Sequence, residues 1–168
     1  MKTVVIAGFY RTGSTWLFNA VKHTLIEAGF KVAQSGNAVS PAPYYDFCVH
    51  KVHEFDPKLL ERAGVVFTSI RDLEDALKSF NRFAGYPMSP EFFEDAFYQF
   101  TKYNDQSDYC MQYNDLLNDK RKVLLDIALV LQVDVNVDRV LKALEAIKLP
   151  RKGWDSRSFY WSNHISLN

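Results

Sequence analysis

The chain has 168 residues, of which 48% are hydrophobic, which is enough for one compact domain with its own core and too little for two ordinary domains. Twenty basic residues balance twenty acidic ones, so the net charge does not indicate a nucleic-acid partner or an anionic membrane surface. No stretch of the sequence has the length of a membrane span, and two cysteines make no disulfide framework. We therefore expect a cytoplasmic protein with reduced thiols.

The first part of the chain alternates predicted strands and helices. The run TVVIAGF is rich in β-branched side chains, as expected of a strand that is buried on both faces of a parallel sheet. Apolar residues then recur at helical spacing from Trp16 to Ala28, and Gly29 is a typical helix stop. Further strands are predicted at residues 30–34, 47–53 and 65–70, with a loop at residues 35–46 and a short helix at residues 56–64.

The rest of the chain is predicted to be mostly helical. An amphipathic helix follows Arg71, with apolar positions from Leu73 to Ala84. Further helices are predicted at about residues 90–103, 119–131 and 137–148. Repeated strand-helix units predict an α/β fold with three layers, α/β/α, in which helices cover a central parallel sheet. We expect residues 1–168 to form a single domain of this class, with a P-loop-like strand-turn-helix at the N-terminus.

The stretch GFYRTGSTW, which begins at Gly8, lies between the first predicted strand and the first predicted helix. Gly8, Gly13 and Thr15 match the phosphate-binding P-loop pattern, whereas Ser14 occupies its lysine position. Backbone N–H groups and the helix dipole favour an anion at such a turn. Arg11 lies inside the loop, and its planar guanidinium suits two oxygens of one anionic group. A plain glycine turn is the alternative, and the pattern alone does not decide between the two.

The predicted strand at residues 47–53, which ends within the stretch HKVHEF, carries a second group of candidate residues. The period of two places Lys51 and His53 on one side of the strand and Cys48 and His50 on the other. A cation and a potential base therefore share one face, although a solvated strand end explains the same spacing without chemistry. A metal site of Cys48, His50 and His53 is disfavoured, because the alternation turns His53 away from the other two.

A third group follows the predicted strand VVFTSI. Arg71 lies at the carboxyl end of this strand, where open α/β sheets bind their ligands. Ser79 comes eight residues later, about two helical turns into the next helix. An ion pair with a nearby acid is the alternative role for Arg71.

Together these residues resemble the sulfotransferases that use 3'-phosphoadenosine 5'-phosphosulfate (PAPS). From Arg11 to Leu17, YRTGSTWL is similar to the family's 5'-phosphosulfate loop, which reads P-K/R-S-G-T-T-W-L. RDLEDALKSF, which begins at Arg71, is similar to the 3'-phosphate motif R-D-P-R-D-x-x-x-S-F. KVH at residues 51–53 resembles the family's K-T-H, and YNDL, which begins at Tyr113, resembles its Y-E-D-L.

The resemblance extends to the C-terminus. RKG at residues 151–153 matches a family motif, and WSNH at residues 161–164 resembles the family's D-W-K-N-H, with Tyr160 in place of the Asp. The motifs occur in the family's order and cover essentially the whole chain. Because the chain is shorter than most family members, we expect it to lack acceptor-covering loops and to keep the donor site.

The resemblance implies a sulfotransferase that moves a sulfuryl group from PAPS to a hydroxyl or amine of a small acceptor. The implied product is 3'-phosphoadenosine 5'-phosphate (PAP), and no metal is implied. His53 would be the general base, while Lys51 and Arg11 would stabilise charge on the transferred group. The residues implied to bind the donor are Arg11, Thr12, Gly13, Ser14, Thr15, Trp16, Arg71, Ser79, Tyr113, Arg151, Lys152 and Gly153. For Trp16, packing in the core is the alternative.

The expected acceptor is a small molecule of apolar or aromatic character, and neither a nucleic-acid nor a membrane partner is expected. Tyr44, Tyr45 and Phe47 precede the strand that carries His53, which makes them candidate acceptor contacts. Two other functions stay open. A P-loop kinase would need an acidic magnesium ligand, for which Asp126 is the candidate, and a non-catalytic nucleotide-binding protein would keep the anion loops without a base.

Overall fold

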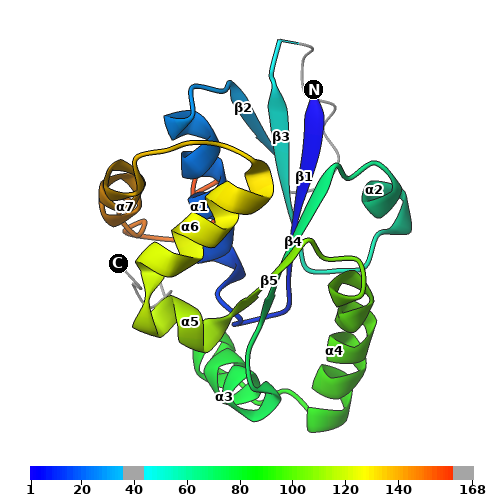
Figure 1. The fold of residues 1–168 in the computed structure, drawn as a ribbon. Coiled ribbons are helices and arrows are strands. Elements are labelled where there is room, and N and C mark those ends of the chain that lie inside the picture. The colour runs from blue at the N-terminus through cyan, green and yellow to red at the C-terminus, as the bar shows by residue number, and fades with distance from the viewer. Residues whose placement is uncertain (36–43, 161–168) are drawn as a thin grey trace.

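The computed structural model describes residues 1–35 and 44–160 of the chain. Within them, parallel strands form one sheet in the order β2-β3-β1-β4-β5 (Figure 1). The strands are β1 (Lys2–Gly8), β2 (Val32–Ser35), β3 (Phe47–Val52), β4 (Val65–Ile70) and β5 (Tyr109–Gln112). Because all pairs are parallel, the carboxyl ends of the strands meet at one edge of the sheet, which is where such folds bind ligands.

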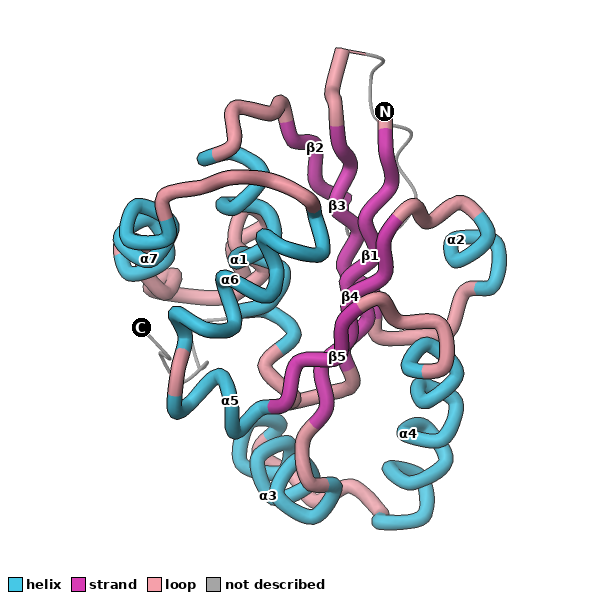
Figure 2. The backbone as a smooth tube through the Cα atoms, viewed as in Figure 1, coloured by secondary structure: helices cyan, strands magenta, loops and turns pink. Residues whose placement is uncertain are grey.

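Helices cover both faces of the sheet. They are α1 (Ser14–Glu27), α2 (Pro57–Glu61), α3 (Leu73–Ala84), α4 (Pro90–Asn104), α5 (Tyr113–Asn118), α6 (Lys120–Leu131) and α7 (Val137–Glu145). Figure 2 shows α1, α6 and α7 on one side of the sheet and α2 and α4 on the other, with α3 beside the edge where the strands end. The predicted three-layer α/β/α fold is confirmed.

The central strand β1 is buried from both sides, as its apolar run predicts. Val4 and Ile6 belong to the core cluster that includes α1, α6 and α7, whereas Val5 and Ala7 belong to the cluster that includes α3 and α4. All four side chains are completely buried. Since full burial of one large apolar side chain contributes about 1.5–3 kcal/mol, β1 is held firmly between the two layers. The loop that follows Gly8 therefore starts from a fixed point.

The strand β5, like the helix α5 that follows it, is not among the elements predicted from the sequence. Its four residues, YCMQ, pair with β4 at the edge of the sheet, in a register that runs from Phe67 opposite Tyr109 to Ile70 opposite Gln112. A strand of this length is too short to show a clear period of two. The predicted helices leave residues 104–118 unassigned, and β5 lies in this gap. In residues 1–35 and 44–160, no helix combines the length and the apolar character needed to cross a membrane.

Candidate active site

A cavity of about 300 Å³ lies where β1, β3 and β4 end. Four cationic side chains line it, namely Arg11, Lys51, Arg71 and Arg82, and its described lining contains no Asp or Glu. In a chain with zero net charge, this arrangement gathers positive charge in one place. Its volume is at the lower end of the range for ligand pockets. The cavity is therefore suited to an anionic ligand.

The loop from β1 to α1 forms one wall of this cavity. Gly8 has no room for a side chain, because a Cβ there would lie 1.9 Å from the Cβ of Ser14. Gly13, at the N-cap of α1, has a φ of 88°, which side chains other than glycine rarely adopt. As a glycine, it gives the first turn of α1 no side-chain cap. Ser14, Thr15 and Trp16 of that turn line the cavity, so the positive end of the helix dipole lies against it.

Thr12 supports the loop from within the protein. Its side chain is completely buried, and its hydroxyl donates to the carbonyl oxygen of Phe9 at 2.7 Å. The hydroxyl of Ser69 donates in turn to Thr12 Oγ1, also at 2.7 Å. Thr12 therefore fixes the shape of the loop, and its side chain is not part of the cavity wall.

Arg11 reaches from the loop to α3. Its Nε donates to the hydroxyl of Ser79 at 3.2 Å, and its guanidinium carbon lies 4.7 Å from the centre of the Phe83 ring. Burial is the largest cause that lowers the pKa of Arg11, and repulsion from Arg71 and Arg82 lowers it further. The backbone at Arg11 has a φ of 66°, which is uncommon outside glycine. Backbone and side chain together hold this cation in the cavity.

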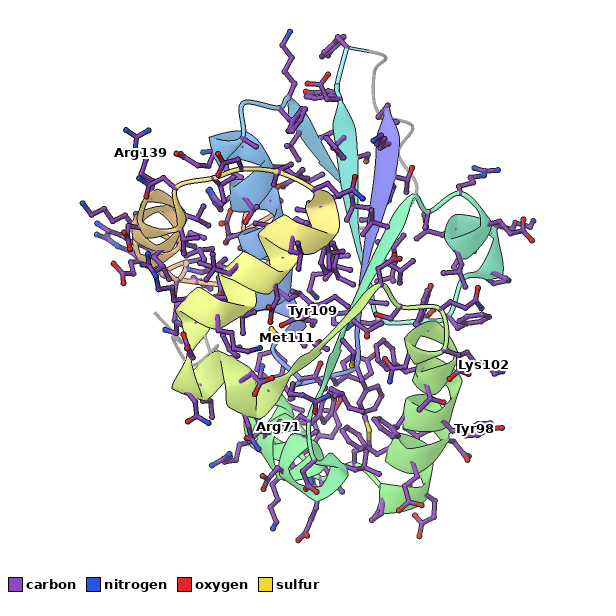
Figure 3. All side chains as sticks on the ribbon, in the orientation of Figure 1. Arg71, Tyr98, Lys102, Tyr109, Met111 and Arg139 are labelled. Carbon is purple, nitrogen blue, oxygen red and sulfur yellow. The ribbon has the colours of Figure 1, made fainter. Side chains whose placement is uncertain are left out.

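Arg71 follows directly on β4, and Figure 3 shows it near the edge where the strands end. Its Nη1 donates to the carbonyl oxygen of Arg11 at 3.4 Å, and its guanidinium carbon lies 4.2 Å from the centre of the Tyr113 ring. Its Nε is buried and has no hydrogen-bond partner in the described part of the chain. A buried donor without a partner costs about 1–3 kcal/mol. Arg71 is therefore positioned to bind an acceptor group of a ligand.

Lys51 lies in β3, His53 lies just past its end, and the two side chains contact each other. Lys51 Nζ lies 2.5 Å from Nε2 of His53, and Nδ1 of His53 lies 2.7 Å from the carbonyl oxygen of Gly8. Since a carbonyl only accepts, Nδ1 carries the proton and Nε2 presents its lone pair to Lys51. Lys51 is only 8% exposed, which excludes a solvated strand end, and burial lowers its pKa to about 7.

Among the described residues, no three His, Cys, Asp or Glu side chains are grouped to hold a metal ion.

Six further side chains line the cavity without a site role predicted from the sequence: Tyr10, Phe80, Arg82, Phe83, Phe159 and Tyr160. Two sequence signals point to some of them. Tyr10 directly precedes Arg11, and Phe83 is one helical turn after Ser79, on the same side of α3. No local sequence pattern predicts that Phe159 lines the cavity, because its position depends on contacts between distant parts of the chain.

Residues 154–160 fold back onto α1. The Nδ2 of Asn19 donates to the carbonyl oxygen of Ser158 at 2.7 Å, and Nζ of Lys22 donates to that of Arg157 at 2.6 Å. The ring of Phe159 packs edge-on against Phe18 of α1, at 4.7 Å between centroids. This turn brings Phe159 and the buried Tyr160 to the cavity.

The RKG motif does not reach the cavity. Arg151 and Lys152 are exposed, Gly153 has a φ of 71°, and none of the three lines the cavity. Their role in binding a 3'-phosphate stays a prediction. The WSNH motif at residues 161–164 lies outside the described residues.

The other candidates from the sequence lie elsewhere. Phe47 begins β3, so Tyr44, Tyr45 and Phe47 lie a strand length from the carboxyl end that carries the cavity, and none of them lines it. Asp126 lies in α6, accepts from Nζ of Lys122 at 2.9 Å and does not line the cavity either. The structure therefore does not bring the candidate magnesium ligand to the phosphate-binding loop.

Comparison with known proteins gives matches among solved structures. No protein-family model matches the chain, and no curated protein matches it. The structure is similar to that of retinol dehydratase in complex with androsterone and the inactive cofactor PAP, with a TM-score of 0.55, 12% identity, and coverage of 84% of this chain and 63% of that chain. A second structure, retinol dehydratase with retinol and PAP, gives a TM-score of 0.54, 12% identity, and coverage of 88% and 65%.

These similarities establish the fold. The chain has the fold that the sulfotransferase motifs predict, and it spans less than two thirds of the length of the chains it matches. Both matched structures are complexes with PAP.

Proposed function

We propose that this protein transfers a sulfuryl group from PAPS to a hydroxyl or amine of a small acceptor. The observation that carries the proposal is the convergence, in one cavity, of Arg11, Arg71 and the Lys51–His53 pair. The motifs that resemble those of the sulfotransferases are far apart in the sequence, yet residues from four of them line the cavity at this edge of the sheet. The fold shared with two PAP complexes supports the same assignment.

The donor would lie between the helix N-terminus and the two arginines. When bound, PAPS supplies a sulfuryl group on a 5'-phosphate, together with a 3'-phosphate. The loop and the first turn of α1 would hold the 5' end through backbone N–H groups and the hydroxyls of Ser14 and Thr15. The 3'-phosphate would be held by Ser79 and by Arg71, whose Nε has no partner among the described residues. No lysine in the P-loop position is needed, because this ligand lacks a magnesium-bridged triphosphate.

Arg11 would connect the two ends of the donor. It belongs to the loop by sequence, but its Nε contacts Ser79 at 3.2 Å. Trp16 and Tyr113 both line the cavity and would contact the adenine. Trp16 is only 2% exposed and also belongs to the core around α1, so core packing and a ligand contact are compatible for this side chain.

His53 would remove the proton from the acceptor. Its Nδ1–H bond to Gly8 selects the tautomer in which Nε2 is the base. Lys51 has to leave Nε2 before that nitrogen can accept a proton, and an anion in the cavity gives its ammonium a stronger partner. In this account Lys51 stabilises the charge on the transferred group and also exposes the base when the donor is bound.

The acceptor would enter from the side of the cavity that His53 faces. Aromatic rings line this side, with Tyr10 stacked on the imidazole and Phe80 edge-on to Tyr10. Such walls suit an apolar or aromatic acceptor.

The test is an acceptor screen with PAPS that carries labelled sulfur, using the wild-type protein and a His53→Ala variant. We expect transfer to at least one phenol, alcohol or amine without added metal, and loss of about two orders of magnitude in turnover in the variant. An Asp126→Asn variant serves as a control and should transfer at the wild-type rate. Magnesium-dependent turnover of ATP without sulfuryl transfer would favour a kinase, and tight PAP binding without any transfer would favour a non-catalytic nucleotide-binding protein.

A further inference from the structure

We propose that Tyr10 is a positioning residue for His53, which holds the plane of the imidazole while Nε2 takes the acceptor's proton. This inference rests on the proposed role of His53 as the general base. Tyr10 stands where the sulfotransferase loop motif quoted above has a proline, so the motif gives this residue no role. The proposal therefore comes from the contacts of the Tyr10 ring.

His53 needs support because it lies just past the end of β3, in a bend. The Nδ1–H bond to the carbonyl oxygen of Gly8, at 2.7 Å, restrains one edge of the ring, but a hydrogen bond weakens steeply only below about 120° and so permits some rotation of the ring about the Cβ–Cγ bond. The contact at Nε2 comes from Lys51, which has to leave before the base can act. A contact on the face of the ring restrains this rotation without occupying either nitrogen.

Tyr10 makes such a contact. Its ring centroid lies 5.1 Å from that of His53, with 18° between the planes, which is a stacked arrangement. The contact leaves both imidazole nitrogens to their hydrogen-bond partners. The Tyr10 hydroxyl is not needed for it, so phenylalanine at this position should serve as well.

The Tyr10 ring is itself held on two sides. Phe9 meets it edge-on at 5.3 Å and 64°, and Phe80 of α3 meets it edge-on at 5.4 Å and 64°. Phe80 follows Ser79, the partner of Arg11. One short loop therefore contacts the base twice, through the carbonyl of Gly8 and the ring of Tyr10, and contacts α3 through Arg11. The loop that would bind the donor also sets the orientation of the base.

The effect of losing the stack follows from geometry. Proton transfer needs the base within hydrogen-bond reach of the acceptor, and a displacement of about 1 Å costs on the order of 100-fold in rate. Tyr10→Leu keeps an apolar side chain but removes the flat face. We expect it to lower kcat by about tenfold or more and to leave the Kd for PAP within about twofold of wild type; the acceptor KM is measured separately, because the Tyr10 ring also lines the acceptor side. Tyr10→Phe should keep the wild-type kcat.

The first experiment uses nitrogen-15 NMR of the imidazole, which does not depend on activity. At about pH 8 the wild type and Tyr10→Phe should show His53 as the Nδ1–H tautomer, whereas Tyr10→Leu should show a mixture of tautomers and shifted ring protons. Phe83→Leu is the matched control, since it removes a cavity ring that packs on Arg11, and it should leave the His53 signals unchanged. Thermal unfolding of each variant verifies that it is folded.

The second experiment is a double-mutant cycle on kcat. In the His53→Ala background, Tyr10→Leu should cause no further loss, because a positioning residue acts only through the group it positions. If the His53 signals change as expected but the wild type transfers no sulfuryl group, the proposed function fails and the positioning role stands. Unchanged His53 signals in Tyr10→Leu, equal losses in Tyr10→Phe and Tyr10→Leu, or a loss that appears only in the acceptor KM would each overturn the inference.

Discussion

Replacing Arg71 by methionine should weaken PAP binding severely while leaving the protein folded. Two of its N–H groups are available to a ligand, because Nε has no partner among the described residues and Nη1 makes only a long bond of 3.4 Å to the carbonyl oxygen of Arg11. A hydrogen bond to a charged group contributes about 1.5 kcal/mol or more. Two such bonds give about 3 kcal/mol, which is a factor of about 150 in Kd.

The effect of Arg71→Met on folding should be small, because two contributions oppose each other. The variant removes a buried donor without a partner, which costs about 1–3 kcal/mol. It also removes the contact of the guanidinium with the Tyr113 ring at 4.2 Å, which contributes about 0.5–2 kcal/mol. At the middle of these ranges the two contributions differ by about 1 kcal/mol, so we expect the free energy of unfolding to change by about that amount.

Titration calorimetry with PAP and with adenosine 5'-monophosphate measures the role of Arg71 directly. In the wild type PAP should bind more tightly, since only PAP has the 3'-phosphate. In Arg71→Met the two ligands should bind with similar Kd. Arg62→Met is the charge-matched control, as Arg62 is an exposed side chain after α2 that does not line the cavity. A PAP affinity within threefold of wild type, or an equal loss for both ligands, would refute the role given to Arg71.

Three further predictions concern the loop, the base and the buried lysine. Gly8→Ala should abolish PAP binding and lower the free energy of unfolding by roughly 2 kcal/mol or more, because its Cβ would lie 1.9 Å from the Cβ of Ser14. Gly64→Ala is the control, since the nearest atom to its Cβ would be 3.5 Å away. In thermal-shift assays with PAP, Gly64→Ala should keep both the stability and the PAP binding of the wild type. His53→Ala should lower turnover about 100-fold in steady-state assays and leave PAP affinity near normal, and an unchanged rate would remove His53 from the mechanism. Burial lowers the pKa of Lys51 from 10.5 to about 7, so between these pH values the folded state binds fewer protons than the unfolded state. In urea titrations, the difference in free energy of unfolding between the wild type and Lys51→Met should therefore rise in favour of the wild type from about pH 7 toward pH 10.5. If this difference does not change with pH, Lys51 is not buried as described.

The sequence predicts the sheet and most of the anion site because the signals are local. The apolar run of β1 and the glycines that follow it determine a strand, a tight turn and a helix within a few residues. The spacing of Lys51 and His53 follows from the period of a strand. Arg71 directly follows β4, and its place near the ligand edge follows from the parallel fold.

The aromatic wall and the C-terminal turn depend on contacts that no local pattern encodes. Phe159 reaches the cavity because Asn19 and Lys22 of α1 hold the carbonyls of residues 157 and 158, well over a hundred positions later in the chain. The strand β5 exists because β4 offers an edge to pair with, and its own four residues show no period. The contact between Arg11 and Ser79 likewise requires the packing of α3 against the loop.

The most direct test of the central claim compares PAP with adenosine 5'-diphosphate in calorimetric titrations of the wild-type protein without metal. Both ligands carry adenosine and two phosphates, and they differ in where the second phosphate is attached. We expect PAP to bind at least about tenfold more tightly, since Arg71 and Ser79 would contact only a 3'-phosphate. Equal affinity for the two ligands, or tighter binding of ATP with magnesium than of PAP, would contradict the account.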